Sequence, residues 1–303
     1  RLYLASAGVS LAVAWCLAHL LRTRRPGIAW GVVGVYTTVL AVVTAERVPV
    51  WTDELTLWQD AAPRAPLMLK PQLRLGDALA ERGRAEEAEA AYLHAVALRP
   101  QHPGVRNNLG LLYARQGRLA PAEEQFRAAL GASPRMVPAR LNLAGLLLRQ
   151  GRWQEAEAQC DTALQAEDTQ GAAQKQLAQI ALRFRGDPTR ALAYYDEALQ
   201  LPLGAGSDAW CGRGVALRAL GRAREAEESY RRALALDPRH AESWLNLGNL
   251  LRDGAQAEAA SQAYGQAVAS SSDAELRALA LEQLRLLHPQ RPQDTAGKPP
   301  PSL

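Results

Sequence analysis

The sequence predicts an all-α protein in which two membrane-spanning helices precede a right-handed α-α superhelix of helix pairs. Three observations carry this prediction. The 303 residues are 48% hydrophobic and rich in Ala, Leu, Arg and Glu, which favour helices over strands. Two uncharged apolar runs lie near the N-terminus, and after residue 68 one pattern recurs every 34 residues. The elements are justified below in chain order.

The two apolar runs predict a transmembrane hairpin over residues 1–45. Residues 2–21 contain no Asp, Glu, Lys or Arg, and residues 28–45 are uncharged as well. At a rise of about 1.5 Å per residue, a helix of about 20 residues crosses the apolar core of a bilayer. A buried hairpin of a soluble protein is disfavoured because neither run has polar positions at helical spacing.

The loop between the two runs predicts how the hairpin is oriented. It carries Arg22, Arg24 and Arg25, which favour the cytoplasmic side. The sequence therefore predicts an integral membrane protein of a bacterial inner membrane, with a lipid bilayer as one partner. The rest of the chain is expected on the periplasmic, non-cytoplasmic side. Because the chain opens with Arg1 inside an apolar pattern, we also expect it to be the C-terminal part of a longer protein.

Residues 46–68 form a predicted juxtamembrane linker. Trp51 and Trp58 flank a short amphipathic stretch, with Thr52 as the expected N-cap. Tryptophan is typical of the membrane interface, so an anchoring elbow is the first interpretation of this segment. A substrate-facing loop of a membrane enzyme is the alternative.

The repeated segment combines small residues, one aromatic residue and a terminal proline at fixed offsets. The small residues are expected where two helices of a pair approach closely, and the aromatic side chain fills the gap toward the next pair. Glycines between the helices are expected at positive φ. The fourth copy is degenerate and slips by one residue. The first copy has Gly76, Ala88, Tyr92, Ala95 and Pro100, and the turn glycines are Gly83, Gly117, Gly151, Gly186 and Gly221.

This period and these offsets resemble the tetratricopeptide repeat (TPR). The resemblance covers residues 69–272 and implies six repeats that bury their apolar faces only by stacking. Residues 273–288 form a predicted capping helix with leucines at helical spacing. Residues 289–303 are predicted to be disordered because they are rich in polar residues and proline.

The sequence predicts no catalytic residues, no metal site and no cofactor. The five histidines are scattered, and no zinc-protease, phosphate-loop, dinucleotide or nucleophile-elbow motif occurs. Cys16, Cys160 and Cys211 lack metal-ligand spacing and are interpreted as small buried side chains. A net charge of +4 over the whole chain does not argue for a nucleic-acid partner.

A broken row of side-chain amides is the candidate binding site. The residue two positions before each small residue of the first helix is expected to face the concave groove. Amides there can pair with the backbone of an extended peptide, because each offers a donor and an acceptor. Plain repeat consensus is the competing explanation. The row is interrupted by Arg74 and Gly212, and its amide members are Asn108, Asn142, Gln176 and Asn246.

The order of parts before the repeats resembles a second family. An opening of the type Arg-Leu-Tyr-Leu, a second apolar run and an Arg-x-x-x-Trp-x-Asp-Glu-x-x-Leu-Trp segment from Arg47 to Trp58 precede the repeats. This is similar to the C-terminal half of transmembrane-and-TPR proteins, a GT-C-type group linked to protein O-mannosylation, and their bacterial relatives. In the family the opening has a proline where Ala5 stands here. The resemblance implies catalytic residues upstream of this chain and carries none onto it.

Two functional hypotheses follow. The first is a membrane-anchored TPR scaffold that binds a protein or peptide in its concave groove on the non-cytoplasmic face. The second is the acceptor-binding C-terminal part of a membrane O-glycosyltransferase, so whether the whole protein is an enzyme stays open. An assembly factor for envelope or secretion machinery is a third, weaker alternative.

Overall fold

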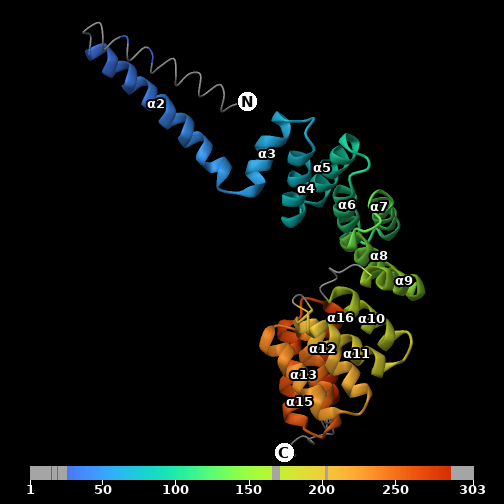
Figure 1. Ribbon diagram of the computed structural model, residues 1–303. Coiled ribbons are helices and arrows are strands. Elements are labelled where there is room, and N and C mark those ends of the chain that lie inside the picture. Colours follow the sequence, from blue (N-terminus) through green and yellow to red (C-terminus); the bar gives the residue numbers. More distant parts are fainter. Residues whose placement is uncertain (1–14, 16–18, 20–25, 166–170, 202–203, 288–303) are drawn as a thin grey trace, which may run out of the picture. The chain divides into compact units, whose positions relative to one another are not determined.

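The computed structural model describes residues 15, 19, 26–165, 171–201 and 204–287 and consists of helices there (Figure 1). The chain divides into two compact units, Arg1–Leu112 and Tyr113–Leu303, which are described separately. The first unit holds α2 (Pro26–Trp51), α3 (Glu54–Arg64), α4 (Leu69–Glu81), α5 (Ala85–Leu98) and most of α6 (Pro103–Arg115).

The second unit continues the pairs of antiparallel helices. In chain order it contains α7 (Leu119–Ala132), α8 (Val137–Arg149), α9 (Trp153–Leu164), α10 (Ala172–Arg183), α11 (Pro188–Leu199), α12 (Ser207–Ala219), α13 (Ala223–Leu236), α14 (Ala241–Asp253), α15 (Ala257–Ser270) and α16 (Ala274–Leu287). Within a repeat, α8 packs on α9, α10 on α11, α12 on α13 and α14 on α15. The last helix, α16, packs against α15 and α14.

The membrane prediction is wrong for the part of the chain that the structure describes. None of its helices combines the length and the apolar character needed to cross a bilayer. Segment 28–45 lies inside α2, where Thr37 and Thr38 donate to carbonyls of the same helix and two glycines add little hydropathy. The helix then runs on through the charged residues Glu46 and Arg47. Apart from Trp15 and His19, the first segment, 2–21, lies outside the described residues.

The fold class, the localisation and the lipid partner that were inferred from the membrane prediction are corrected as well. The fold class is all-α, without the two transmembrane helices that the apolar runs suggested. An integral-membrane localisation is contradicted by the same finding, and a lipid bilayer is not supported as a partner.

In the first unit, α3 occupies the predicted linker and packs against α4. Its N-cap is Asp53 rather than Thr52: the Asp53 carboxylate accepts from the Thr56 N–H and also pairs with Arg82 at the end of α4. The Gln72 side-chain amide of α4 donates to the buried carbonyl of Ala62 at 3.1 Å. These contacts join α3 to the first repeat.

The turns within the repeats confirm the role expected for glycine. The five predicted turn glycines lie at φ between 62° and 76°, a conformation that L-residues with a side chain disfavour. In the last repeat the corresponding turn is made by Ala255 at φ 58°. A glycine in the sequence therefore does not mark the turn of the last repeat, where Ala255 adopts the positive φ instead.

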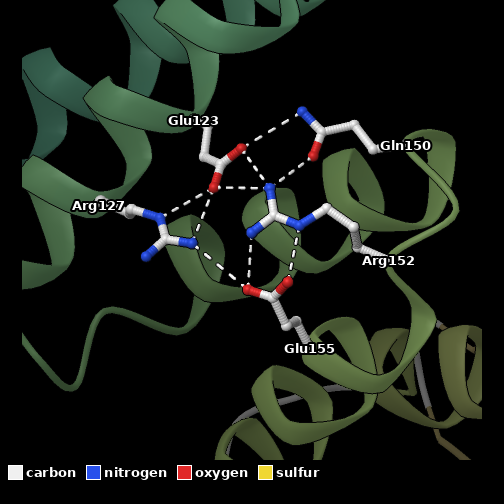
Figure 2. A network of polar contacts seen from close by, with 5 residues as sticks. All are labelled: Glu123, Arg127, Gln150, Arg152 and Glu155. Atoms are coloured by element: carbon white, nitrogen blue, oxygen red, sulfur yellow. Dashed lines mark hydrogen bonds and ion pairs between the residues drawn. The ribbon is translucent and has the colours of Figure 1, made fainter.

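Polar contacts also join one repeat to the next. Glu123 on α7 accepts from Arg127 of its own helix, from the side chain of Gln150 and from Arg152 before α9 (Figure 2). Arg152 in turn donates to Glu155. Burial opposes ionisation of Glu123, but the hydrogen bonds from Arg152 and Arg127 outweigh it and lower its pKa.

The same joint recurs one repeat later. Glu157 on α9 pairs with Arg185 before α11 at 2.6 Å. Its position is that of Glu123 plus 34 residues. The acidic members of these inter-repeat ion pairs thus follow the sequence period.

One buried tyrosine lacks the partner that its counterparts have. The Tyr92 hydroxyl donates to Asp77, and the Tyr264 hydroxyl donates to Asn249, each at 2.8 Å. The acceptor in both cases directly follows the small glycine of the first helix. Val215 takes that place in the fifth repeat, and the buried Tyr230 hydroxyl has no hydrogen-bond partner among the described residues.

Because the two hydroxyls differ in this way, replacing Tyr264 and Tyr230 by Phe should change the free energy of unfolding differently. Tyr264→Phe should lower the free energy of unfolding by about 1 kcal/mol, because it leaves the partly buried Asn249 acceptor without its donor. Tyr230→Phe should be neutral or stabilising, because it removes a buried group that forms no bond. Equilibrium urea unfolding followed by circular dichroism measures both. Equal losses in the two variants would contradict the assignment.

Candidate functional site

The first helices of four consecutive repeats in the second unit line a groove. On α10, Ala172, Gln176, Gln179 and Arg183 follow one another at spacings of four, three and four, which places them on one stripe of the helix, and Lys175 and Leu182 flank this stripe. The groove has two parts that share Gln176, Gln179 and Arg183. The larger part, over α10, α12 and α14, holds about 590 Å³, and the smaller part, between α8 and α10, holds about 450 Å³.

The larger part is mixed in chemistry. Leu182, Tyr195 and Val215 supply apolar surface, and Gly212 contributes backbone without a side chain. The rest of its lining is polar or charged, apart from Ala172 and the buried Cys211, and includes Lys175, Gln176, Gln179, Arg183, Asp208 and Glu242. Neither Lys175 nor Arg183 forms an ion pair with a residue in the described ranges.

The smaller part is positively charged. Arg149 and Arg183 come from equivalent positions, 34 residues apart, at the ends of α8 and α10. The remaining lining residues are Gly145, Leu148, Gln176, Gln179 and Phe184, so no acidic residue lines this part. Arg149 donates to the carbonyl of Ala114 at 3.1 Å.

Of the four predicted amides, only Gln176 lines the groove, and its amide is already bonded. Its nitrogen donates to the carbonyl of Leu141 on α8 at 3.0 Å, and its oxygen accepts from the Cys160 thiol of α9 at 3.1 Å. Burial raises the pKa of Cys160 to about 12, so this thiol stays protonated and can donate. Gln176 therefore joins its helix to the preceding repeat.

The other three predicted amides are not among the residues that line the groove. In the first unit, Asn108 donates to Asp77 at 2.8 Å, the same carboxylate oxygen that accepts from Tyr92. In the second unit, Asn246 contacts the sulfur of Cys211 at 3.6 Å, and Asn142 is half-buried on α8. Peptide binding through these amides stays a prediction.

The gap in the row at Gly212 has a steric cause. A Cβ atom at this position would lie 2.3 Å from the ring of Tyr195 on α11. Tyr195 is 4% exposed, and burial raises its pKa. The space that an amide would occupy is thus partly filled by this ring.

A charged hydrogen bond links two repeats beside the groove. The Nε2 atom of His240, before α14, lies 2.9 Å from the carboxylate of Asp208 on α12. The Ser243 hydroxyl lies 2.8 Å from Nδ1. The bond to Asp208 raises the pKa of His240 to about 10, and the same bond lowers the pKa of Asp208.

Sequence reasoning missed the charged residues of the groove. The available signal was the recurrence of arginine at Arg149 and Arg183, one period apart. The acidic residues Asp208 and Glu242 also lie one period apart, whereas Lys175 does not recur and gave no such signal. Cys160 and Cys211 are buried and free, as the sequence predicted for them.

Comparisons with known proteins agree with this architecture. Family models described as tetratricopeptide repeat match residues 67–135, 107–173, 146–209, 177–223, 207–240 and 229–263. The chain belongs to the tetratricopeptide repeat family. No curated protein sequence matches the chain.

Solved TPR structures are similar in fold. The APC/C hetero-tetramer Cut9-Hcn1 aligns with a TM-score of 0.67 and 16% identity over 76% of this chain and 46% of that one. A TPR protein from Parabacteroides merdae aligns at 0.62 with 17% identity, over 76% and 89% of the two chains. Pseudomonas aeruginosa pilF aligns at 0.60 with 19% identity, over 71% and 97%.

At these identities the likeness establishes the TPR fold alone. This chain spans about half the length of the Cut9-Hcn1 chain that it matches. The resemblance of its first part to the GT-C-type glycosyltransferase group is not shown by these comparisons.

Substituting alanine for two glycines of the groove distinguishes the effect of side-chain packing on stability from the effect of helix propensity. Gly212→Ala should destabilise the TPR by about 1–3 kcal/mol, because the new Cβ collides with the Tyr195 ring. Gly145→Ala is the matched control, since its Cβ would meet only the Gln176 amide at 3.5 Å. It should be neutral or stabilising by up to about 1 kcal/mol through helix propensity. Urea unfolding of both variants tests this; a Gly212→Ala protein as stable as Gly145→Ala would refute the contact.

Stability should also depend on pH through the bond between Asp208 and His240. A raised His240 pKa adds stability that is complete below its unfolded value of 6.5 and is lost as pH rises through about 10. The lowered pKa of Asp208 means that its contribution is lost as pH falls below about 3.8.

We therefore expect Asp208→Asn to cost about 1 kcal/mol near pH 6, a small value because water screens the exposed carboxylate. The difference from the wild type should shrink toward pH 10. Urea unfolding at both pH values measures it, and Glu242→Gln, which removes a neighbouring carboxylate without a charged partner, is the control. A difference that is the same at both pH values would show that the bond does not titrate.

Proposed function

We propose that the chain is a TPR scaffold whose groove over α8, α10, α12 and α14 holds an extended peptide segment of a partner protein. The observation that carries the proposal is the continuity of the groove across four repeats, through the shared residues Gln176, Gln179 and Arg183. A volume of about 590 Å³ in its larger part lies within the range of ligand-binding clefts.

The electrostatics of the groove support a polar ligand. Lys175, Arg183 and Glu242 line it without ion pairs to other residues of the described chain, so their charges are available to a partner. One protein of similar fold, Cut9-Hcn1, is part of a hetero-tetramer, which is an assembly of protein chains. A protein partner therefore fits both the site and the fold.

A selection experiment tests the proposal. Random peptides displayed on phage are selected on the immobilised full chain and then compared on Gln179→Trp, in which an indole covers the exposed centre of the groove. Peptides that use the groove should lose at least tenfold in affinity for this variant. Glu228→Trp, on the exposed surface of α13, is the control and should bind them normally.

The two variants make the outcome unambiguous. Circular dichroism first establishes that both are folded. If no selected peptide distinguishes Gln179→Trp from the wild type, the groove is not a peptide site and the proposal fails.

A further inference from the structure

The last described helix, α16, exposes more apolar surface than the end of a repeat array normally does. It packs on α15 and α14, and its one fully buried residue is Ala280. Leu279, Leu281 and Leu286 lie away from this contact and are 45%, 40% and 64% exposed. Repeat arrays usually end in a helix with a polar outer face, which keeps them in solution. The three leucines therefore indicate that α16 has a further packing partner.

The repeat period identifies the uncovered side of α16. Leu281 stands 34 residues after Leu247, and Ala278 stands 34 residues after Trp244. Leu247 is 5% exposed in α14, a first helix that pairs with α15 as its second helix. Leu281 is exposed because α16 has no second helix among the described residues. The uncovered side of α16 is therefore the one on which the second helix of a repeat would pack.

Two exposed charges stand near the ends of this side. Glu275 lies in the first turn of α16 and Arg285 in the last. Neither side chain forms a hydrogen bond or ion pair with another residue in the described ranges. They are about 15 Å apart along the helix, and their separation of nearly three turns keeps both on one side. Ala278 lies between them, and its small side chain lets a second helix approach closely.

This arrangement of charges fits a second copy of α16 that runs in the opposite direction. A two-fold axis at the level of Ala280, midway between the charges, sets Glu275 of each copy opposite Arg285 of the other. The same axis brings Leu281, one residue from the midpoint, beside Leu281 of the second copy. A parallel pair would instead place Glu275 beside Glu275 and Arg285 beside Arg285. The charges therefore favour the antiparallel pair.

The third charge on this side does not oppose the pairing. Glu282 is exposed and lies two residues from the midpoint, so it falls opposite Ala278 of the second copy. Glu275 and Arg285 also complement the dipole of α16 itself, which explains their positions at its two ends. The dipole does not account for the exposed Leu281, and by itself it predicts no association of chains.

We propose that the uncovered side of α16 binds the same side of a second copy of the chain as an antiparallel helix pair. The surface consists of Glu275, Ala278, Leu281, Glu282 and Arg285. None of these residues is among those that line the groove, so this proposal does not depend on the proposed function. Because two helices of 14 residues bury a small area, we expect a weak dimer that forms in proportion to concentration.

Charge reversal on the full chain tests the pairing. Sedimentation velocity over a range of protein concentrations should show a monomer–dimer equilibrium for the wild type. Glu275→Arg and Arg285→Glu each bring like charges together twice, once at each symmetric contact, and should weaken the dimer at least tenfold. The double variant Glu275→Arg/Arg285→Glu restores opposite charges and should return the dissociation constant to within about threefold of the wild type.

Matched controls make the same charge changes at other helix ends. Glu258→Arg in the first turn of α15 and Arg115→Glu in the last turn of α6 should leave the dimer unchanged. Circular dichroism establishes that every variant is folded. A chain that stays monomeric at all concentrations, or a dimer that none of the α16 variants weakens, overturns the proposal. Failure of the double variant to regain the association lost in the single variants overturns it as well.

Discussion

The close approach of the two helices in each repeat is the constraint on which the rest of the structure depends. Added Cβ atoms at Gly76, Gly214 and Gly248 would lie 2.5–2.6 Å from the ring of the tyrosine opposite. In these three repeats only a residue without a side chain admits the ring, so the ring sets the distance between the paired helices there. The same contact occurs once in the first unit, at Gly76, and twice in the second, at Gly214 and Gly248.

A second packing rule connects neighbouring repeats and explains the groove. The aromatic position of one repeat lies against the amide position of the next. Where that position holds the small Cys160, the long Gln176 reaches its thiol; where it holds the large Tyr195, Gly212 leaves room for the ring. The two positions thus compensate each other in size. Glycine at this joint removes an amide from the groove lining, and the Tyr195 ring takes its place.

These contacts show what the sequence could predict and what it could not. The period predicted the helix pairs, the small residues and the turn glycines, because each depends on one residue at a fixed offset. It did not predict the bonding of Gln176, because a side chain at a groove position can equally face a ligand or the preceding repeat. The membrane prediction failed because it counted missing charges in residues 28–45 and gave too little weight to the glycines and threonines of α2.

Whether an arginine already forms an ion pair within the chain decides whether it can bind a ligand carboxylate. Arg152 is held by Glu123 and Glu155, so a ligand carboxylate would have to replace two existing ion pairs and would gain little (Figure 2). Arg183 has no such pair within the described chain, and its contact with a ligand carboxylate would be a net addition. Bonded amides and paired arginines therefore hold the repeats together. In the groove, Lys175, Arg183 and Glu242 form no ion pair with other residues of the described chain, so their charges are not used in packing the repeats.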